Sequence, residues 1–138
     1  MDLAKLATVL QGAKEGSEYL DYAIQRVLFG MAKPVPEYTR SLDAAVQLVP
    51  QGWSIHRLSH LSDCRGGFAG WVGDIYRAGD AMIPFPSVGT AATAPLALCN
   101  AVIRVRLGEQ QAAEEAQRAE AEAEAMAVEQ RQLQRSGT

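Results

Sequence analysis

The chain has 138 residues, of which 48% are hydrophobic and 21% are charged, and its formal net charge is −3. This length supports one compact domain, and the acidic balance argues against a dedicated nucleic-acid surface, which normally carries a clustered basic excess. The two cysteines, Cys64 and Cys99, show no spacing typical of a disulfide framework or a metal site. No signal-peptide pattern or membrane-length apolar run occurs, so we expect a cytoplasmic protein without a membrane partner.

The first third of the chain is predicted to be helical. Residues 2–13 form a short amphipathic helix, and Gly16 and Ser17 then interrupt the pattern. Ser17 can cap a second helix over 18–29, which Gly30 is placed to end. The predicted inward side chains of the first helix are Leu3, Leu6, Ala7 and Leu10. Those of the second helix are Leu20, Ile24, Val27 and Leu28.

Two prolines separate this region from a third predicted helix. Pro34 and Pro36 push the residues before them towards extended backbone, which indicates a connector. Ser41 can cap a helix over 42–48, and Pro50-Gln51-Gly52 ends it. Its predicted inward side chains are Leu42, Ala45, Val46 and Val49.

The centre of the sequence is rich in aromatic and β-branched residues. Segments 53–58 and 68–76 are predicted strands, and the turn-forming cluster 62–67 between them favours an antiparallel hairpin. A short third strand over 81–85 is confined to a sheet edge by Pro84 and Pro86. The strand residues expected to face the core are Trp53, Ile55, Ala69, Trp71, Gly73 and Ile75.

From Thr90 onwards the sequence reads as one long helix. Thr93 is a suitable cap, Pro95 falls in the first turn, and Leu98, Val102 and Val105 follow on one face. Cys99 lies among apolar residues and is expected to behave as a small hydrophobic side chain. The composition changes near Gly108, which predicts a compact α+β domain over 1–108 and a helical extension or tail over 109–138.

The tail continues the apolar stripe at a seven-residue period, but with small side chains. Segment 109–135 holds seven Glu and three Arg, so its formal charge is −4 and that of 1–108 is about +1. A coiled coil built mainly on alanines would bury little area at each contact. Three readings remain open: a solvated single helix, a helix that docks onto a partner or a second copy, and disorder. The stripe comprises Glu109, Ala112, Ala116, Ala119, Ala123, Met126, Gln130 and Leu133.

His56, His60 and Cys64 are spaced four residues apart, as the metal ligands of a helix can be. The local sequence is typical of strand and turn, where four residues span roughly 13 Å. We therefore expect rim histidines, with no metal and no other cofactor. A small hydrolase or metal protein that uses Cys64 beside Asp63 and His60 stays an alternative, although sequence proximity alone is weak support for catalytic partners.

Four aromatic residues exceed what one face of a small sheet can hide: Trp53, Trp71, Tyr76 and Phe85. Aromatic side chains are favoured anchors at protein interfaces. These four residues are therefore candidate partner-binding residues, against the alternative that all of them lie under the helices.

Two stretches together resemble a known family. Residues 36–53 (PEYTRSLDAAVQLVPQGW) and 92–102 (ATAPLALCNAV), separated by the aromatic hairpin, are similar to small phage and prophage proteins grouped as the phage ABA sandwich domain. The resemblance covers about 18–107, including Tyr19-Leu20-Asp21. It implies a small antiparallel sheet with helices on both sides and a phage origin, and it implies no activity. The chain departs from the pattern in a short region between Phe29 and Tyr38 and in the additional tail.

The sequence leads us to expect a non-catalytic phage or mobile-element protein that binds a host protein, such as a host defence inhibitor of the anti-CRISPR type. The acidic tail would lie against a basic groove that normally receives nucleic acid. The alternative is a self-associating structural or virion-related component that pairs through its C-terminal helix. The tail residues predicted to contact the partner are Glu114, Glu115, Glu120, Glu122, Glu124 and Met126.

Overall fold

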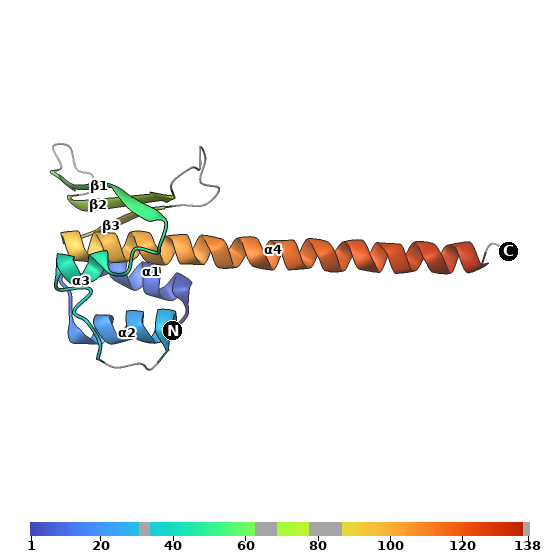
Figure 1. Ribbon diagram of the computed structural model, residues 1–138, viewed down its shortest axis with the longest axis horizontal. Helices are drawn as coiled ribbons and strands as arrows, with labels where there is room; N and C mark the ends of the chain where they lie inside the picture. The colour runs from blue at the N-terminus through green and yellow to red at the C-terminus, as the bar shows by residue number, and fades with distance from the viewer. Residues whose placement is uncertain (31–33, 63–68, 78–86, 137–138) are drawn as a thin grey trace. The chain divides into compact units, whose positions relative to one another are not determined.

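In the computed structural model the described residues are 1–30, 34–62, 69–77 and 87–136. They form an α+β fold with a three-stranded antiparallel sheet and a long C-terminal helix, as the sequence predicts (Figure 1). Contacts divide the chain into two compact units, Met1–Gly108 and Glu109–Thr138. The elements in order are α1 (Leu3–Gly12), α2 (Glu18–Phe29), α3 (Leu42–Val46), β1 (Trp53–Leu61), β2 (Gly70–Arg77), β3 (Val88–Ala91) and α4 (Ala94–Ser136).

Side-chain caps start the helices where the sequence predicts. The hydroxyl of Ser17 accepts a hydrogen bond from the backbone N–H of Leu20 at 3.2 Å, and Ser41 caps α3 in the same way. Thr93 caps α4 through the N–H of Leu96 at 3.4 Å. Each cap satisfies a backbone donor that the first helical turn leaves unpaired. Gly30 ends α2 with a φ of 81°, a left-handed conformation that favours glycine.

The predicted hairpin between the first two strands is confirmed. β1 pairs with β2 in antiparallel register, with Ile55 opposite Ile75 and His60 opposite Trp71. The register shifts between Ile55 and Arg57, which is a β-bulge at His56. β1 also continues to Leu61, three residues beyond the prediction, so both histidines belong to the strand.

The third strand is not the one predicted. β3 pairs with β2 over Val88–Ala91, whereas the predicted strand over 81–85 lies outside the described residues. The expectation that the helical stretch starts at Thr90 is wrong for Thr90 and Ala91, which lie in β3. The ladder to β2 satisfies their backbone groups, and the helix begins only after Thr93.

Glycines bring the sheet very close to the first part of α4. A Cβ added to Gly73 would lie 3.0 Å from the backbone oxygen of Ala97. A Cβ on Gly89, which is opposite Gly73 in the register, would overlap the backbone of Ala101. Gly89 needs glycine because the helix backbone occupies the space of a side chain, and a Cβ at Gly73 would require the neighbouring backbone to shift by a few tenths of an ångström.

Residues 94–108 of α4 form the centre of the first unit. The predicted stripe of Leu98, Val102 and Val105 is fully buried, and so are residues on the other faces. Figure 1 explains this burial, because the sheet lies on one side of this segment and α1 and α2 lie on the other. The further fully buried residues of this segment are Leu96, Ala97, Cys99, Asn100, Ala101 and Ile103.

The expectation of helices on both sides of the sheet is not met. Within the described residues of the first unit, α1, α2, α3 and residues 94–108 of α4 lie on one side of the sheet (Figure 1). The other face of the sheet carries exposed polar side chains such as Ser54 and Arg57, which offer little apolar surface to a helix. The first unit is therefore layered: the sheet packs on residues 94–108 of α4, and α1 and α2 pack on the opposite side of that segment.

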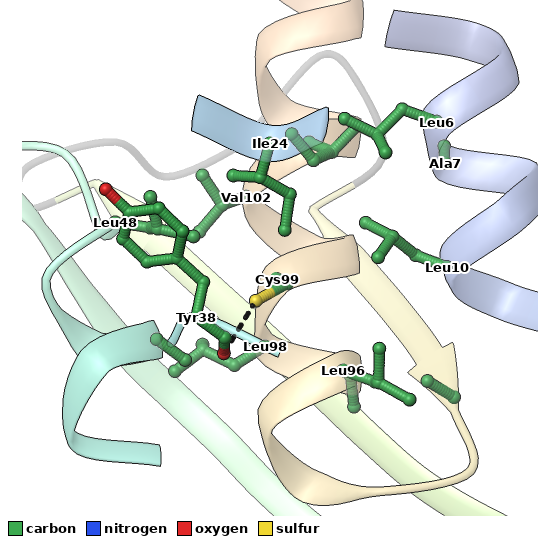
Figure 2. Close-up of a cluster of buried hydrophobic side chains, with 14 of the residues drawn as sticks. Leu6, Ala7, Leu10, Ile24, Tyr38, Leu48, Leu96, Leu98, Cys99 and Val102 are labelled. Carbon is green, nitrogen blue, oxygen red and sulfur yellow. Dashed lines mark hydrogen bonds between the residues drawn. The ribbon is translucent and has the colours of Figure 1, made fainter. Parts of the chain in front are cut away.

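Figure 2 shows how three helices fill the core around Cys99. Leu6, Ala7 and Leu10 of α1 point towards α4, as the sequence predicts, and Ile24 of α2 joins them. Val27 and Leu28, also predicted to face inwards, are only partly buried against this core.

The predicted inward face of α3 is wrong at two positions. Leu42 and Val46 are 39% and 44% exposed, whereas Ala45 is fully buried. The helix has only five residues, so the helical spacing does not continue beyond Val46. Leu48 reaches the core from the turn that follows α3.

Candidate interaction surfaces

Asp21 is the centre of a buried polar cluster between α2 and the segment before α3. Its carboxylate is 1% exposed and accepts hydrogen bonds from the backbone N–H of Thr39 at 2.7 Å and from the hydroxyl of Thr39 at 2.6 Å. Arg40 donates through Nε at 2.9 Å. This hydrogen-bonded ion pair raises the pKa of Arg40. Buried carboxylates need such partners because desolvation of an unpaired charge is costly.

Neighbouring contacts extend the cluster along the same segment. The hydroxyl of Tyr38 donates to Oε1 of Gln25 at 2.6 Å, and burial raises the pKa of Tyr38. A Cβ on Gly16 would overlap the backbone of Thr39, so the two segments touch directly. These contacts give Asp21, Tyr38 and Thr39 a structural role.

Cys99 and Asn100 of α4 also make contacts that join elements of the fold. The thiol of Cys99 donates to the backbone oxygen of Tyr38 at 3.3 Å (Figure 2), and burial raises the pKa of this thiol. Nδ2 of Asn100 donates to the backbone oxygen of Thr90 at 2.9 Å and so ties α4 to β3. The prediction that Cys99 is a buried, small hydrophobic side chain is confirmed.

The exposed side of the sheet carries a small group of polar side chains centred on Asp74. Nδ1 of His56 lies 3.2 Å from Oδ2 of this carboxylate, and the hydroxyl of Ser87 donates to Oδ1 at 2.9 Å. The ring of Tyr76 meets the ring of His56 edge to face, with 5.8 Å between the centroids. The bulge at His56 brings the imidazole to Asp74.

This arrangement does not have the order of a catalytic triad. A nucleophilic serine needs a histidine as its base, and the carboxylate then orients that histidine. Here Asp74 lies between Ser87 and His56, so the hydroxyl is paired with the carboxylate. The structure also does not bring His60 to His56, because His60 packs against Trp71 at 5.4 Å between ring centroids.

The proposed metal and hydrolase alternative depends on Cys64, which lies outside the described residues. Among the residues that the structure describes, no three His, Cys, Asp or Glu side chains are close enough to hold a metal ion.

The aromatic residues predicted to bind a partner lie in different environments. Trp53 and Trp71 are half-buried and pack against the core, and the guanidinium of Arg77 lies 5.9 Å from the Trp53 ring centroid. Tyr76 is 42% exposed, and Phe85 lies outside the described residues. The described members therefore form no single exposed patch.

Exposed tyrosines occur on α2, and neither is among the predicted partner-binding residues. Tyr19 is 69% exposed and Tyr22 is 43% exposed. Together with Val27 and Arg26 they line a shallow, mainly apolar cavity of about 320 Å³. Their three-residue spacing on the face opposite Leu20 and Ile24 is the signal that could have identified this surface.

The tail residues predicted to contact a partner are all accessible. Every described residue from 110 to 136 is exposed, including Met126 at 63% and Leu133 at 66%. The segment is helical throughout, as predicted, with a side-chain hydrogen bond from Gln110 to Glu114 along its surface. Six Glu and three Arg lie on this exposed helical segment, so its surface is acidic.

Comparison of the chain with protein-family models, with curated proteins and with solved structures finds no match. Within the described parts of the chain, no helix has both the length and the apolar character that crossing a bilayer requires.

Proposed function

We propose that this chain is a non-catalytic accessory protein of a phage or mobile element, which binds a host protein through its acidic C-terminal helix. The observation that carries the proposal is the exposed helical segment from 110 to 136, which holds six of the seven Glu residues of the tail. Such a surface attracts a partner of opposite charge and repels nucleic acid. A basic groove that normally receives a nucleic-acid backbone has the matching charge.

The polar clusters of the first unit support this proposal because they have structural roles. The hydrogen bonds of Asp21 and Asn100 join elements of the fold to each other. In the cluster around Asp74 on the exposed side of the sheet, Ser87 is paired with the carboxylate and not with His56. These arrangements fit a scaffold that presents a binding segment better than an active site.

The phage origin and the role against host defence rest on the resemblance of 36–53 and 92–102 to phage proteins. An acidic surface of this kind is complementary to the basic groove of a nucleic-acid-binding defence complex. Inhibition of a defence nuclease of the CRISPR type is therefore the specific activity that we propose.

The proposal is tested by affinity capture from a nuclease-treated bacterial lysate with two forms of the full chain. One is the native sequence, and the other carries Gln at the Glu positions of 114–129. We expect a host complex with the native chain only, because neutralisation removes the attraction and keeps the helix. Equal capture by both forms would contradict the role of the tail. The positions changed are Glu114, Glu115, Glu120, Glu122, Glu124 and Glu129.

A further inference from the structure

The apolar stripe of the tail has a defined position on the helix. At a seven-residue period, the residues from Ala112 to Leu133 on this stripe alternate at spacings of four and three. Two large side chains lie on it, Met126 and Leu133, and both are mostly exposed. The rest of the stripe is mainly alanine, which allows the backbone of a second helix to approach closely.

The charges of the tail are sorted with respect to this stripe. In a helix pair, the positions directly beside the apolar stripe face the partner and carry the interhelical ion pairs. All charged residues at these flanking positions are acidic, and every arginine of the tail lies elsewhere on the helix. The flanking acids are Glu115, Glu120, Glu122 and Glu129. The arginines are Arg118, Arg131 and Arg135.

A second copy of this chain is a poor occupant of such a stripe. In a parallel pair, Glu115 of one copy faces Glu120 of the other, and the two Glu109 side chains meet on the stripe. In an antiparallel pair, the row of Glu115, Glu122 and Glu129 faces the same row of the other copy. Both arrangements place like charges together and offer no basic partner.

We infer that residues 112–133 bind a basic amphipathic helix of the partner protein, which places large apolar side chains on the alanine stripe and Lys or Arg beside Glu115, Glu120, Glu122 and Glu129. This inference rests on the proposed function, since it specifies which surface of the acidic helix contacts the partner and what chemistry the partner has. Met126 and Leu133 are the apolar anchors, and the arginines remain on the side that faces away from the contact.

The test uses the full chain and a synthetic helix of about four heptads, with Leu on its stripe and Lys at its flanking positions. A peptide with Glu in place of each Lys is the control. Titration calorimetry should show one peptide bound per chain for the Lys peptide and no binding for the Glu peptide. Sedimentation of the chain alone should show a monomer.

Two pairs of variants locate the contact on the helix. The double variant Glu115→Gln/Glu122→Gln removes two flanking charges. The double variant Glu114→Gln/Glu124→Gln removes two charges from other positions, so both variants have the same net charge. We expect the first pair to weaken binding by about two- to tenfold and the second pair to leave it nearly unchanged. Met126→Ala should weaken binding by about tenfold, whereas Val128→Ala, which is off the stripe, should have little effect.

The outcomes separate this inference from the proposed function. Equal losses from both glutamate pairs would mean unspecific attraction and would overturn the inference, while capture of a host complex could still depend on the acidic tail. A dimer of the chain alone would assign the stripe to a second copy and would overturn it as well. Absence of binding to the Lys peptide would also contradict it.

Discussion

At the scale of single residues, the buried polar groups of this protein hold the fold together. Asp21 accepts three hydrogen bonds from Thr39 and Arg40, and it joins α2 to the segment before α3. Removal of one member of such a cluster leaves the remaining donors buried and unpaired. Its contribution to stability can therefore be measured by mutation.

Asp21→Ala should lower the free energy of unfolding by about 3 kcal/mol, because the buried N–H of Thr39 loses its acceptor and Arg40 loses its ion-pair partner. Asp21→Asn keeps an acceptor oxygen and should cost less. Urea denaturation followed by circular dichroism measures both. Asp43→Asn, at an exposed carboxylate of α3, is the control and should stay within about 0.5 kcal/mol of the native chain. A similar small change for Asp21→Ala would refute the role given to this cluster.

The buried thiol of Cys99 should make the stability of the fold depend on pH. Burial raises the pKa of its thiol in the folded state, whereas the unfolded thiol titrates near its usual pKa of about 8.5. The folded state therefore retains a proton that the unfolded state loses. Stability from this group is complete below about pH 8.5 and decreases as pH rises above that value.

This decrease should appear in urea titrations between about pH 8 and 10 in a Cys64→Ser background, where Cys99 is the remaining thiol. Cys99→Ala should remove most of the slope in that range, since Tyr38, the other buried group with a raised pKa, titrates at higher pH. An unchanged slope in Cys99→Ala would show that another group is responsible.

At the scale of elements, close approach of the sheet to α4 decides where glycine is required. Gly89→Ala should lower the free energy of unfolding by about 3 kcal/mol, because its Cβ would overlap the backbone of Ala101 and β3 would have to move. Gly12→Ala is a matched control in α1, where a Cβ meets open space. It should raise stability by about 0.5–1 kcal/mol through the entropy of the unfolded chain. Thermal unfolding of the two variants gives the comparison, and equal effects would contradict the close packing.

At the scale of the whole molecule, the core belongs to the first unit. The buried residues of the described chain lie between Leu6 and Gly108, and the described residues from 110 onwards are exposed. A chain that ends at Ala113 should therefore fold, with a free energy of unfolding within about 1 kcal/mol of the full chain. Urea denaturation followed by tryptophan fluorescence tests this, because Trp53 and Trp71 both lie in the first unit. A large loss of stability would show that the tail contributes to the core.

The local features of the fold are those that the sequence alone determined. Ser17, Ser41 and Thr93 begin their helices as predicted, because a cap depends only on neighbouring residues. The hairpin of β1 and β2, the buried stripe of α1 and the long C-terminal helix follow from periodicity in the same way. The seven-residue stripe of the tail is likewise readable from the sequence.

Tertiary structure decided what sequence spacing could not. Burial of residues 94–108 of α4 on several faces follows from the position of this segment between the sheet and α1 and α2, and periodicity records only one contact face at a time. β3 is a strand because it pairs with β2. Its sequence carries only a weak strand signal, since two of its four residues, Gly89 and Ala91, have low β-propensity. The carboxylate of Asp21 is buried because Thr39 and Arg40, distant in sequence, supply its donors. Long-range contacts of this kind depend on the assembled fold, whereas caps, turns and helical stripes depend on residues within one or two turns of each other.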